Sequence, residues 1–404
     1  MKIIVPHYIL TSESVLQNQA IAFDKQIKKI APFDELIDQF PNAEVTTLRE
    51  NSLLMAGLIN AHVHIEFSAN KTELTYGDFV KWLYSVIENR EELIDNCKQE
   101  CMNKAIDSML DSGITTFGAV SSHGLDLESC VNAKQNVVFF NELIGSQAVM
   151  ADALFGDFLS RLDSSKTIKR DGFYPAVAIH SPYSVHPILI KKALEIVKNE
   201  NLKLTAHFME SQAEREWLDN SDGDFKEFFT NLLKQDSNVS GSKEFLEHFN
   251  KHNALLTHVV KANEDELNTI AKDSQTVIHC PISNRLLGNG AIDLETLKKK
   301  NIRWILATDG LSSNYSLNLF EEMKIALFMH SDTPLNTLAK ELIRSVTVDA
   351  SNALGLNKGD IKEGKDSDMI VLDLDKTPNE DIALHLILQN YNISNIIING
   401  EFIR

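Results

Sequence analysis

Histidines and carboxylates recur at the ends of short apolar runs along the middle of this chain. His62 and His64 lie in "GLINAHVHIEF", and His207 lies in "LTAHFMES" with Glu210 three residues further on. Asp309 follows "WILAT" in the last of these runs. Three imidazoles and a carboxylate can bind one divalent cation, and a further carboxylate can transfer protons. The pattern therefore predicts a metal-assisted catalytic site assembled from distant segments.

The spacing of these residues supports a metal site more strongly for some of them than for others. His62 and His64 are two apart, so on a strand both side chains point to the same side. A His and a Glu three residues apart, such as His207 and Glu210, more often lie on the surface. The pair indicates a catalytic site here only because the other candidates accompany it. Asp309 at the end of an apolar run is costly to bury unless it is paired or binds a metal. Its alternative role is the N-cap of a following turn.

Three further residues are candidates for contacts with a reacting molecule. His258 ends "LLTHVV" and could orient the attacking water, although a core histidine is about as frequent in such a place. His180 in "AIHSPYSVHP" ends another run and could contact substrate. Arg285 in "SNRLLGNG" could meet an anionic group or be structural. No lysine ends the run that carries His180, which favours a site with one metal ion rather than a pair bridged by a carboxylated lysine.

Eight apolar runs, separated by segments with helical periodicity, are expected to position these residues. Nearly continuous apolar strands are typical of a parallel sheet buried on both faces. Eight such units predict a (β/α)₈ TIM-type barrel, whose catalytic groups gather at the C-terminal ends of its strands. The runs are "AGLINAH", "GITTFGAV", "NVVFFNELIG", "YPAVAIH", "LKLTAHF", "ALLTHVV", "TVIHCPIS" and "IRWILATD".

The two ends of the chain have a different character from the middle. Residues 1–56 and 357–404 hold short β-rich runs bounded by Asp, Asn and Gly, which predicts one small β-sandwich domain built from both termini. Residues 57–356 then form the barrel. The segment at about 211–250 is longer than one helix requires, so we expect an inserted helical segment that serves as a lid or an oligomer contact.

Composition excludes several classes of partner. The 404 residues carry a formal net charge of −18 and are 43% hydrophobic, which suits a large core and opposes binding to nucleic acid or to anionic membranes. No apolar run is long enough to span a membrane, and the N-terminal run lacks the apolar core of a signal peptide. The four cysteines form no C-x-x-C pair, and Cys97 and Cys101 are expected to be core thiols. A cytoplasmic protein is expected.

With these residues placed, the chain resembles the amidohydrolase superfamily, in the branch of chlorohydrolases and adenosine-type deaminases. The matching segments are "GLINAHVH", "HSPYSVHP", "HFMES", "THVV", "HCPISNRLLGNG", "ATDGLSSNYSLNLFEEMKIA" and "NALGLNKGDIKEGKDSDMIVLD". They run in the expected order over nearly the whole chain. The phrases "HVHIEFS", "SNRLLGNGAIDLE" and "ATDGLSSNYSL" are closer still to the aminodeoxyfutalosine deaminases of epsilonproteobacteria, which belong to the futalosine route to menaquinone.

The resemblance implies roles for individual residues. It implies one divalent ion, Zn²⁺ or Fe²⁺, bound by His62, His64, His207 and Asp309. It also implies a purine nucleoside-type substrate whose adenine ring is deaminated. Because members of the family often form homodimers, it further implies a homodimer. Glu210 matches the general acid/base, His258 the residue that orients the water, and His180 a substrate contact. Trp82 matches a substrate-binding tryptophan, but Val80 stands where methylthioadenosine deaminases have a ribose-binding Glu.

Other functions remain alternatives at this point. The same chemistry could act on 5′-methylthioadenosine, S-adenosylhomocysteine, adenosine, guanine or a triazine, because such enzymes share their ligands and differ in their loops. A non-catalytic scaffold would be expected to have lost ligands, whereas all of them are present together with Glu210. A hydrolase of cyclic amides usually needs two metal ions and a carboxylated lysine, for which the sequence offers no candidate.

Overall fold

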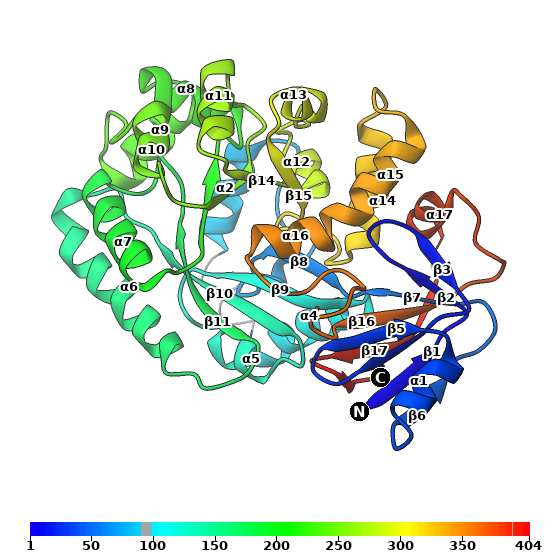
Figure 1. The fold of residues 1–404 in the computed structure, drawn as a ribbon. Coiled ribbons are helices and arrows are strands. Elements are labelled where there is room, and N and C mark those ends of the chain that lie inside the picture. Colours follow the sequence, from blue (N-terminus) through cyan, green and yellow to red (C-terminus); the bar gives the residue numbers. More distant parts are fainter. Residues whose placement is uncertain (90–97, 390) are drawn as a thin grey trace.

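The centre of the computed structural model is an eight-stranded parallel barrel (Figure 1). The structure describes residues 1–89, 98–389 and 391–404. The barrel strands are β8 (Leu58–Val63), β9 (Ile114–Ser121), β10 (Asn136–Leu143), β11 (Phe173–Ile179), β12 (Leu204–Phe208), β13 (Ala254–His258), β14 (Thr276–His279) and β15 (Arg303–Leu306). Each of the eight predicted runs overlaps one of them, so the predicted barrel is confirmed.

The strands follow chain order from β8 to β15, and every neighbouring pair is parallel. Nearly every strand position is buried, because one face fills the barrel and the other packs under helices. The last strand, β15, lies beside β8 and nearly closes the ring. In the β12–β13 ladder Phe208 is opposite His258, so neighbouring strands end at the same level and their last side chains share one mouth.

Helices surround the barrel and connect its strands (Figure 1). Their amphipathic faces bury residues such as Leu189, Ala193 and Val197 of α7 against the strands. They are α2 (Phe79–Glu88), α4 (Gln99–Asp111), α5 (Leu127–Asn132), α6 (Ala151–Lys166), α7 (Pro187–Glu200), α11 (Glu264–Lys272), α12 (Pro281–Leu286), α13 (Leu294–Lys299), α14 (Leu319–Met329), α15 (Leu335–Ser345) and α16 (Val348–Ala353). The short 3₁₀ helices η1 (Ser68–Asn70) and η2 (Ala148–Met150) complete the connections.

Both ends of the chain build sheets beside the barrel, seen as the blue and red strands of Figure 1. One sheet has the order β18-β17-β16-β7-β2-β3 and therefore mixes the two ends, since β7 (Ser52–Ala56) pairs with β16 (Met369–Asp373). The other has the order β5-β4-β1-β6. The remaining elements are β1 (Lys2–Val5), β2 (Tyr8–Leu10), β3 (Val15–Gln17), β4 (Ala20–Phe23), β5 (Ile27–Ala31), α1 (Phe33–Gln39), β6 (Glu44–Thr47), α17 (Ile382–Leu388), β17 (Asn392–Ile398) and β18 (Glu401–Phe402). The domain boundaries at 56 and 357 stay a prediction.

The segment at 211–250 forms three helices over the barrel, α8 (Gln212–Asn220), α9 (Asp224–Leu233) and α10 (Ser242–His248). An aromatic cluster holds α9 in place, in which Phe225 contacts Phe79 of α2 and Tyr183 of the loop after β11. The inserted segment is therefore anchored to two other connections of the barrel mouth.

Two smaller expectations concern cysteines and membranes. Cys130 and Cys280 are buried free thiols. Cys101 was expected to be a core thiol, but it lies half-buried in the first turn of α4 and is disulfide-bonded, while Cys97 falls outside the described residues. Within the described parts of the chain, none of the helices has the length and apolar character needed to cross a membrane.

Candidate active site

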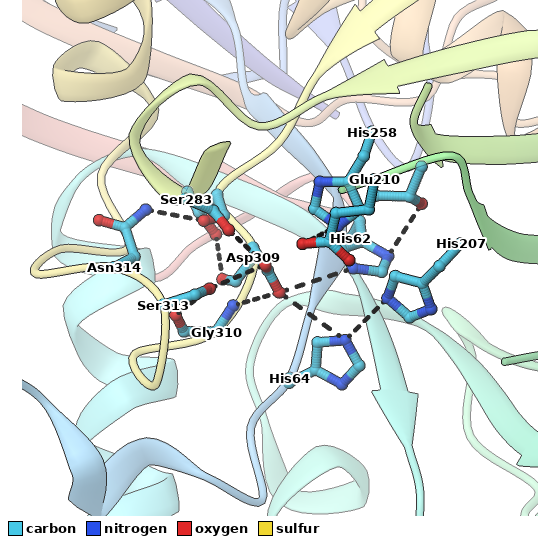
Figure 2. Close-up of polar contacts among 12 residues, drawn as sticks. His62, His64, His207, Glu210, His258, Ser283, Asp309, Gly310, Ser313 and Asn314 are labelled. Carbon is cyan, nitrogen blue, oxygen red and sulfur yellow. Dashed lines mark hydrogen bonds and ion pairs between the residues drawn. The ribbon is translucent and has the colours of Figure 1, made fainter. Parts of the chain in front are cut away.

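The barrel mouth brings together the side chains that the sequence singled out (Figure 2). His62 lies in β8 and His64 just beyond it, His207 lies in β12, and Asp309 follows β15. Nε2 of His62 and Nε2 of His64 are each 3.7 Å from Oδ1 of Asp309. Nε2 of His64 is 3.3 Å from Nε2 of His207. Four potential ligand atoms thus face one point.

The hydrogen bonds of these histidines suit a metal ion. Nδ1 of His207 is 2.9 Å from the carbonyl oxygen of His180, which can only accept, so the Nε2 atom of His207 keeps its lone pair. Nε2 of His62 is buried and has no hydrogen-bond partner within the described part of the chain. Burial lowers the pKa of both His62 and His207, and neutral imidazoles are the form that binds metals. The residues present therefore fit a divalent cation.

Asp309 completes this set as an anion. Burial by itself raises the pKa of its carboxyl, but the contact with His62 and the neighbouring histidines hold that pKa well below its usual value. Ser283 and Ser313 donate hydroxyl hydrogen bonds to its Oδ2 at 2.7 and 2.8 Å. Oδ1 of Asp309 also accepts the backbone N–H of Gly310 at 2.8 Å, and a turn follows at residues 311–313, so Asp309 contacts this turn as well as the histidines.

Glu210 and His258 lie beside the four ligand atoms as a second pair. Oε1 of Glu210 is 3.5 Å from Nε2 of His258 and accepts a hydrogen bond from Nδ2 of Asn289 at 3.2 Å. Burial, followed by the charge of Asp309, raises the pKa of Glu210 well above its usual value. Burial lowers the pKa of His258 to about 4. The raised pKa favours a protonated Glu210 carboxyl, which can donate a proton, and the lowered pKa favours a neutral His258 imidazole, which can accept one.

The backbone at these strand ends is unusual. Met209, His258 and Asp309 have φ values of 49°, 75° and 59°, in the left-handed region that non-glycine residues seldom occupy. Such conformations concentrate at functional sites, where the surrounding structure holds them. At Met209 the left-handed conformation lets the chain leave β12 and direct Glu210 back over the mouth.

A cavity of about 240 Å³ opens onto this cluster. His180, Trp82 and Glu210 line it, and their contacts with a substrate stay predictions. The indole nitrogen of Trp82 donates to the carbonyl oxygen of Ser312 at 2.9 Å. Arg285 is exposed on α12 and does not line the cavity, so its substrate contact stays a prediction. The outer wall is apolar and comes from α2 and α9, with Phe79, Leu83, Val86, Phe228, Phe229 and Leu233.

Several polar residues of the site were not predicted. Glu142 is the second-last residue of β10 and is 1% exposed, and its Oε1 atom is 3.9 Å from Nδ1 of His207. A carboxylate at the end of an apolar run was the same signal that identified Asp309, so Glu142 could have been found. Asn284 accepts a hydrogen bond from Nδ1 of His258 at 2.9 Å. That contact joins the end of β13 to helix α12, 26 residues further on, and has no local sequence signal.

An eight-stranded parallel barrel with three histidines and an aspartate at its mouth defines a metal-dependent hydrolase of the TIM-barrel class. The family model of the amidohydrolase family matches residues 53–403. The chain therefore belongs to the amidohydrolase family, and the predicted membership is confirmed.

Individual relatives show which members of the family this chain is similar to. The chain is 49% identical over 403 residues to an aminodeoxyfutalosine deaminase of Nitratiruptor, covering 99% of both chains. It is 33% identical over 393 residues to an adenosine deaminase of Helicobacter pylori, covering 96% of this chain and 95% of the other. A crystal structure of Helicobacter pylori aminofutalosine deaminase with methylthio-coformycin matches with a TM-score of 0.94 and 30% identity over 100% of both chains.

Proposed function

We propose that this protein is a metal-dependent deaminase that hydrolyses the 6-amino group of the adenine ring of 6-amino-6-deoxyfutalosine. The products are the hypoxanthine analogue and ammonia, as in the futalosine route to menaquinone. The observation that carries the reaction type is the pair of Glu210 and His258, with Oε1 and Nε2 3.5 Å apart, beside the four ligand atoms. The choice of substrate is supported by the 49% identity to the Nitratiruptor enzyme over the full length of both chains.

One divalent ion, zinc or iron, is proposed at His62, His64, His207 and Asp309. When bound there, such an ion lowers the pKa of water toward neutrality and so supplies a nucleophile for attack on an aromatic ring. The supporting observations are the unpartnered Nε2 of buried His62 and the lone pair that His207 keeps on its own Nε2. A single ion is favoured because the strand end at His180 presents no lysine.

The protein's own residues carry the proton transfers. Glu210, whose raised pKa favours the protonated carboxyl, donates to N1 of the purine and makes C6 electrophilic. Asp309 accepts a proton from the attacking water, and His258 orients that water. Addition of the water oxygen to C6 gives a tetrahedral carbon. Transfer of a proton to the amino nitrogen then lets the C6–N bond break, so that ammonia leaves and a C6 carbonyl forms.

A second candidate is a deaminase of 5′-methylthioadenosine, S-adenosylhomocysteine or adenosine. It is favoured by the 33% identity to the Helicobacter pylori adenosine deaminase. It is weakened at Val80, which is buried in α2 where a methylthioadenosine deaminase would place its ribose-binding Glu. A chlorohydrolase or another amidohydrolase deaminase remains a more distant alternative.

Three proposals accompany this function. Residues 211–250 act as a lid, since Phe228, Phe229 and Leu233 of α9 form part of the cavity wall. Residues 1–56 and 357–404 form a separate β domain. The protein works in the cytoplasm as a homodimer on a small-molecule substrate, without nucleic-acid or membrane partners.

The proposal is tested by ultraviolet assays of the metal-replete protein on aminodeoxyfutalosine, 5′-methylthioadenosine and adenosine. The expected result is conversion of adenine to hypoxanthine with the highest kcat/KM on aminodeoxyfutalosine. A His64→Ala variant serves as a control, because it lacks one proposed ligand. Equal values on methylthioadenosine would favour the second candidate, and no conversion of any of the three would reject purine deamination.

A further inference from the structure

The start of helix α8 is built differently from an ordinary helix start. Ser211 is its N-cap, and the Ser211 hydroxyl accepts the backbone N–H of Glu214 at 3.1 Å. A Glu at this third helical position normally returns to the N–H of the N-cap residue and so completes a capping box. Here the Glu214 side chain reaches further back along the chain, to the two residues that precede Ser211.

The two contacts of the Glu214 carboxylate are specific. Its Oε1 accepts the backbone N–H of Met209 at 3.0 Å, and its Oε2 accepts the backbone N–H of Glu210 at 2.7 Å. Glu214 is 1% exposed, so water does not compete for these groups. Met209 is the residue in the left-handed conformation, with φ 49°. The carboxylate therefore holds the turn that carries Glu210 out of β12.

Helix α11 provides an internal comparison. There Asn263 is the N-cap and Glu266 occupies the same third position, but Glu266 accepts the N–H of Asn263 itself at 2.8 Å and forms the complete capping box. Glu266 is 4% exposed, so it is as buried as Glu214. The same residue type at the same position thus stabilises a helix in α11, whereas in α8 it binds the backbone of the candidate acid/base.

We infer that Glu214 is a positioning residue, which fixes the direction of the Glu210 side chain by binding the backbone N–H groups of Met209 and Glu210. This inference rests on the proposed role of Glu210 as the general acid/base. Placement within a fraction of an ångström matters because a misplacement of about 1 Å can cost about 100-fold in rate. Glu214 does not line the cavity and acts only through Glu210.

The charges around Glu214 are consistent with this role. Glu210 and Arg215 lie on its own segment, Glu266 comes from α11, and Tyr183 comes from the loop after β11. Burial raises the pKa of Glu214 to about 7. Its negative charge is one of the causes, after burial and Asp309, that raise the pKa of Glu210.

Two variants of Glu214 distinguish its effect on the position of Glu210 from the effect of its charge on the pKa of Glu210. Glu214→Gln keeps the length of the side chain but turns one acceptor into a donor and removes the charge. We expect kcat on the metal-replete enzyme to fall about tenfold or more with little change in KM. The basic limb of the pH–kcat profile should move to lower pH, because Glu210 then loses its proton more easily. Glu214→Asp keeps the charge but is too short for both N–H groups, so kcat should fall without this shift.

Glu266→Gln is the matched control for position, since it removes a buried carboxylate that caps α11 and pairs with Arg215 but does not touch Glu210. It should lower the melting temperature and leave kcat unchanged. A Glu214→Gln enzyme with wild-type kcat, or with only the change seen in Glu266→Gln, would overturn the inference. If the wild-type protein deaminates no purine, the proposed function fails instead. A crystal structure of Glu214→Gln then decides this inference, which is overturned if the Glu210 carboxyl has not moved.

Discussion

Nε2 of His64 lies 3.3 Å from Nε2 of His207, although 143 residues separate them along the chain. The two rings are nearly parallel, with an angle of 13° between their planes. The carbonyl oxygen of His180 accepts from Nδ1 of His207, so Nε2 of His207 carries a lone pair that can bind a cation. Because Nε2 of His64 also lies 3.7 Å from Oδ1 of Asp309, this relationship supports a metal site.

Removal of His207 should therefore remove the metal. His207→Ala deletes one of four proposed ligands, so the bound divalent ion measured by elemental analysis should fall from about one equivalent toward zero. Chelation should lower the melting temperature of the wild-type protein, because an ion that binds the folded state stabilises it. His252→Ala, which changes a half-buried histidine that does not line the cavity, is the control and should keep its metal. Equal metal content in both variants would contradict the ligand assignment.

The contact between Asn284 and His258 predicts a pH effect. Burial lowers the pKa of His258 to about 4, and Asn284 accepts from its Nδ1. In Asn284→Asp a carboxylate faces the same nitrogen and should raise that pKa by about one to two units. Since the neutral imidazole is the active form, the acidic limb of the pH–kcat profile should move to higher pH.

Asn284→Ala is the comparison for this variant, because it loses the hydrogen bond without gaining a charge. It should lower kcat and leave the acidic limb near its original position. If the Ala and Asp variants shifted the limb by the same amount, the charge argument would be wrong.

His330 predicts how stability changes with pH. Its Nε2 is 2.9 Å from Nε2 of His279, and burial lowers the pKa of His330 to about 4. The unfolded chain binds a proton near pH 6.5 and the folded chain only near pH 4, so the free energy of unfolding should fall as pH decreases through this window. Over the same fall in pH, the free energy of unfolding of His330→Gln should decrease less than that of the wild type. The difference should be about 1–2 kcal/mol after allowance for the partial exposure of His330.

The measurement is urea unfolding at pH 7 and pH 4.5 on both proteins after chelation, so that loss of metal does not contribute. Wild-type and variant proteins whose stabilities fall in parallel would show that His330 does not titrate as described.

Much of the fold and the ligand set could be predicted from the sequence, for a physical reason. Parallel strands buried on both faces appear as nearly continuous apolar runs, and an ionisable residue that ends such a run is conspicuous. His62, His207, His258 and Asp309 each follow this rule, and the structure brings them together. The sequence left Asp309 as either a ligand or a turn cap, and the structure shows its Oδ1 near both histidines and bonded to the N–H of Gly310.

The supporting contacts could not be predicted, because they depend on backbone conformation and distant loops. Asn289 reaches Glu210 across 79 residues, in a loop whose path no local pattern specifies. Glu214 looks like an ordinary capping residue in the sequence. Its actual partners depend on the left-handed conformation of Met209. The sequence does not indicate that conformation, because the residue is not a glycine. The buried pair of Lys358 and Asp368, 2.7 Å apart, likewise lies in a loop-rich region without a periodic signal.

Glu210→Gln tests the central claim most directly. The amide cannot donate a carboxyl proton to the purine, while the four ligands stay intact. The account predicts that kcat for deamination falls by about 1,000-fold, with the metal content unchanged. Glu216→Gln on α8, whose side chain accepts from Gln212 at 3.0 Å, is the control and should keep wild-type activity. A Glu210→Gln enzyme that binds metal and deaminates at near the wild-type rate would contradict the account.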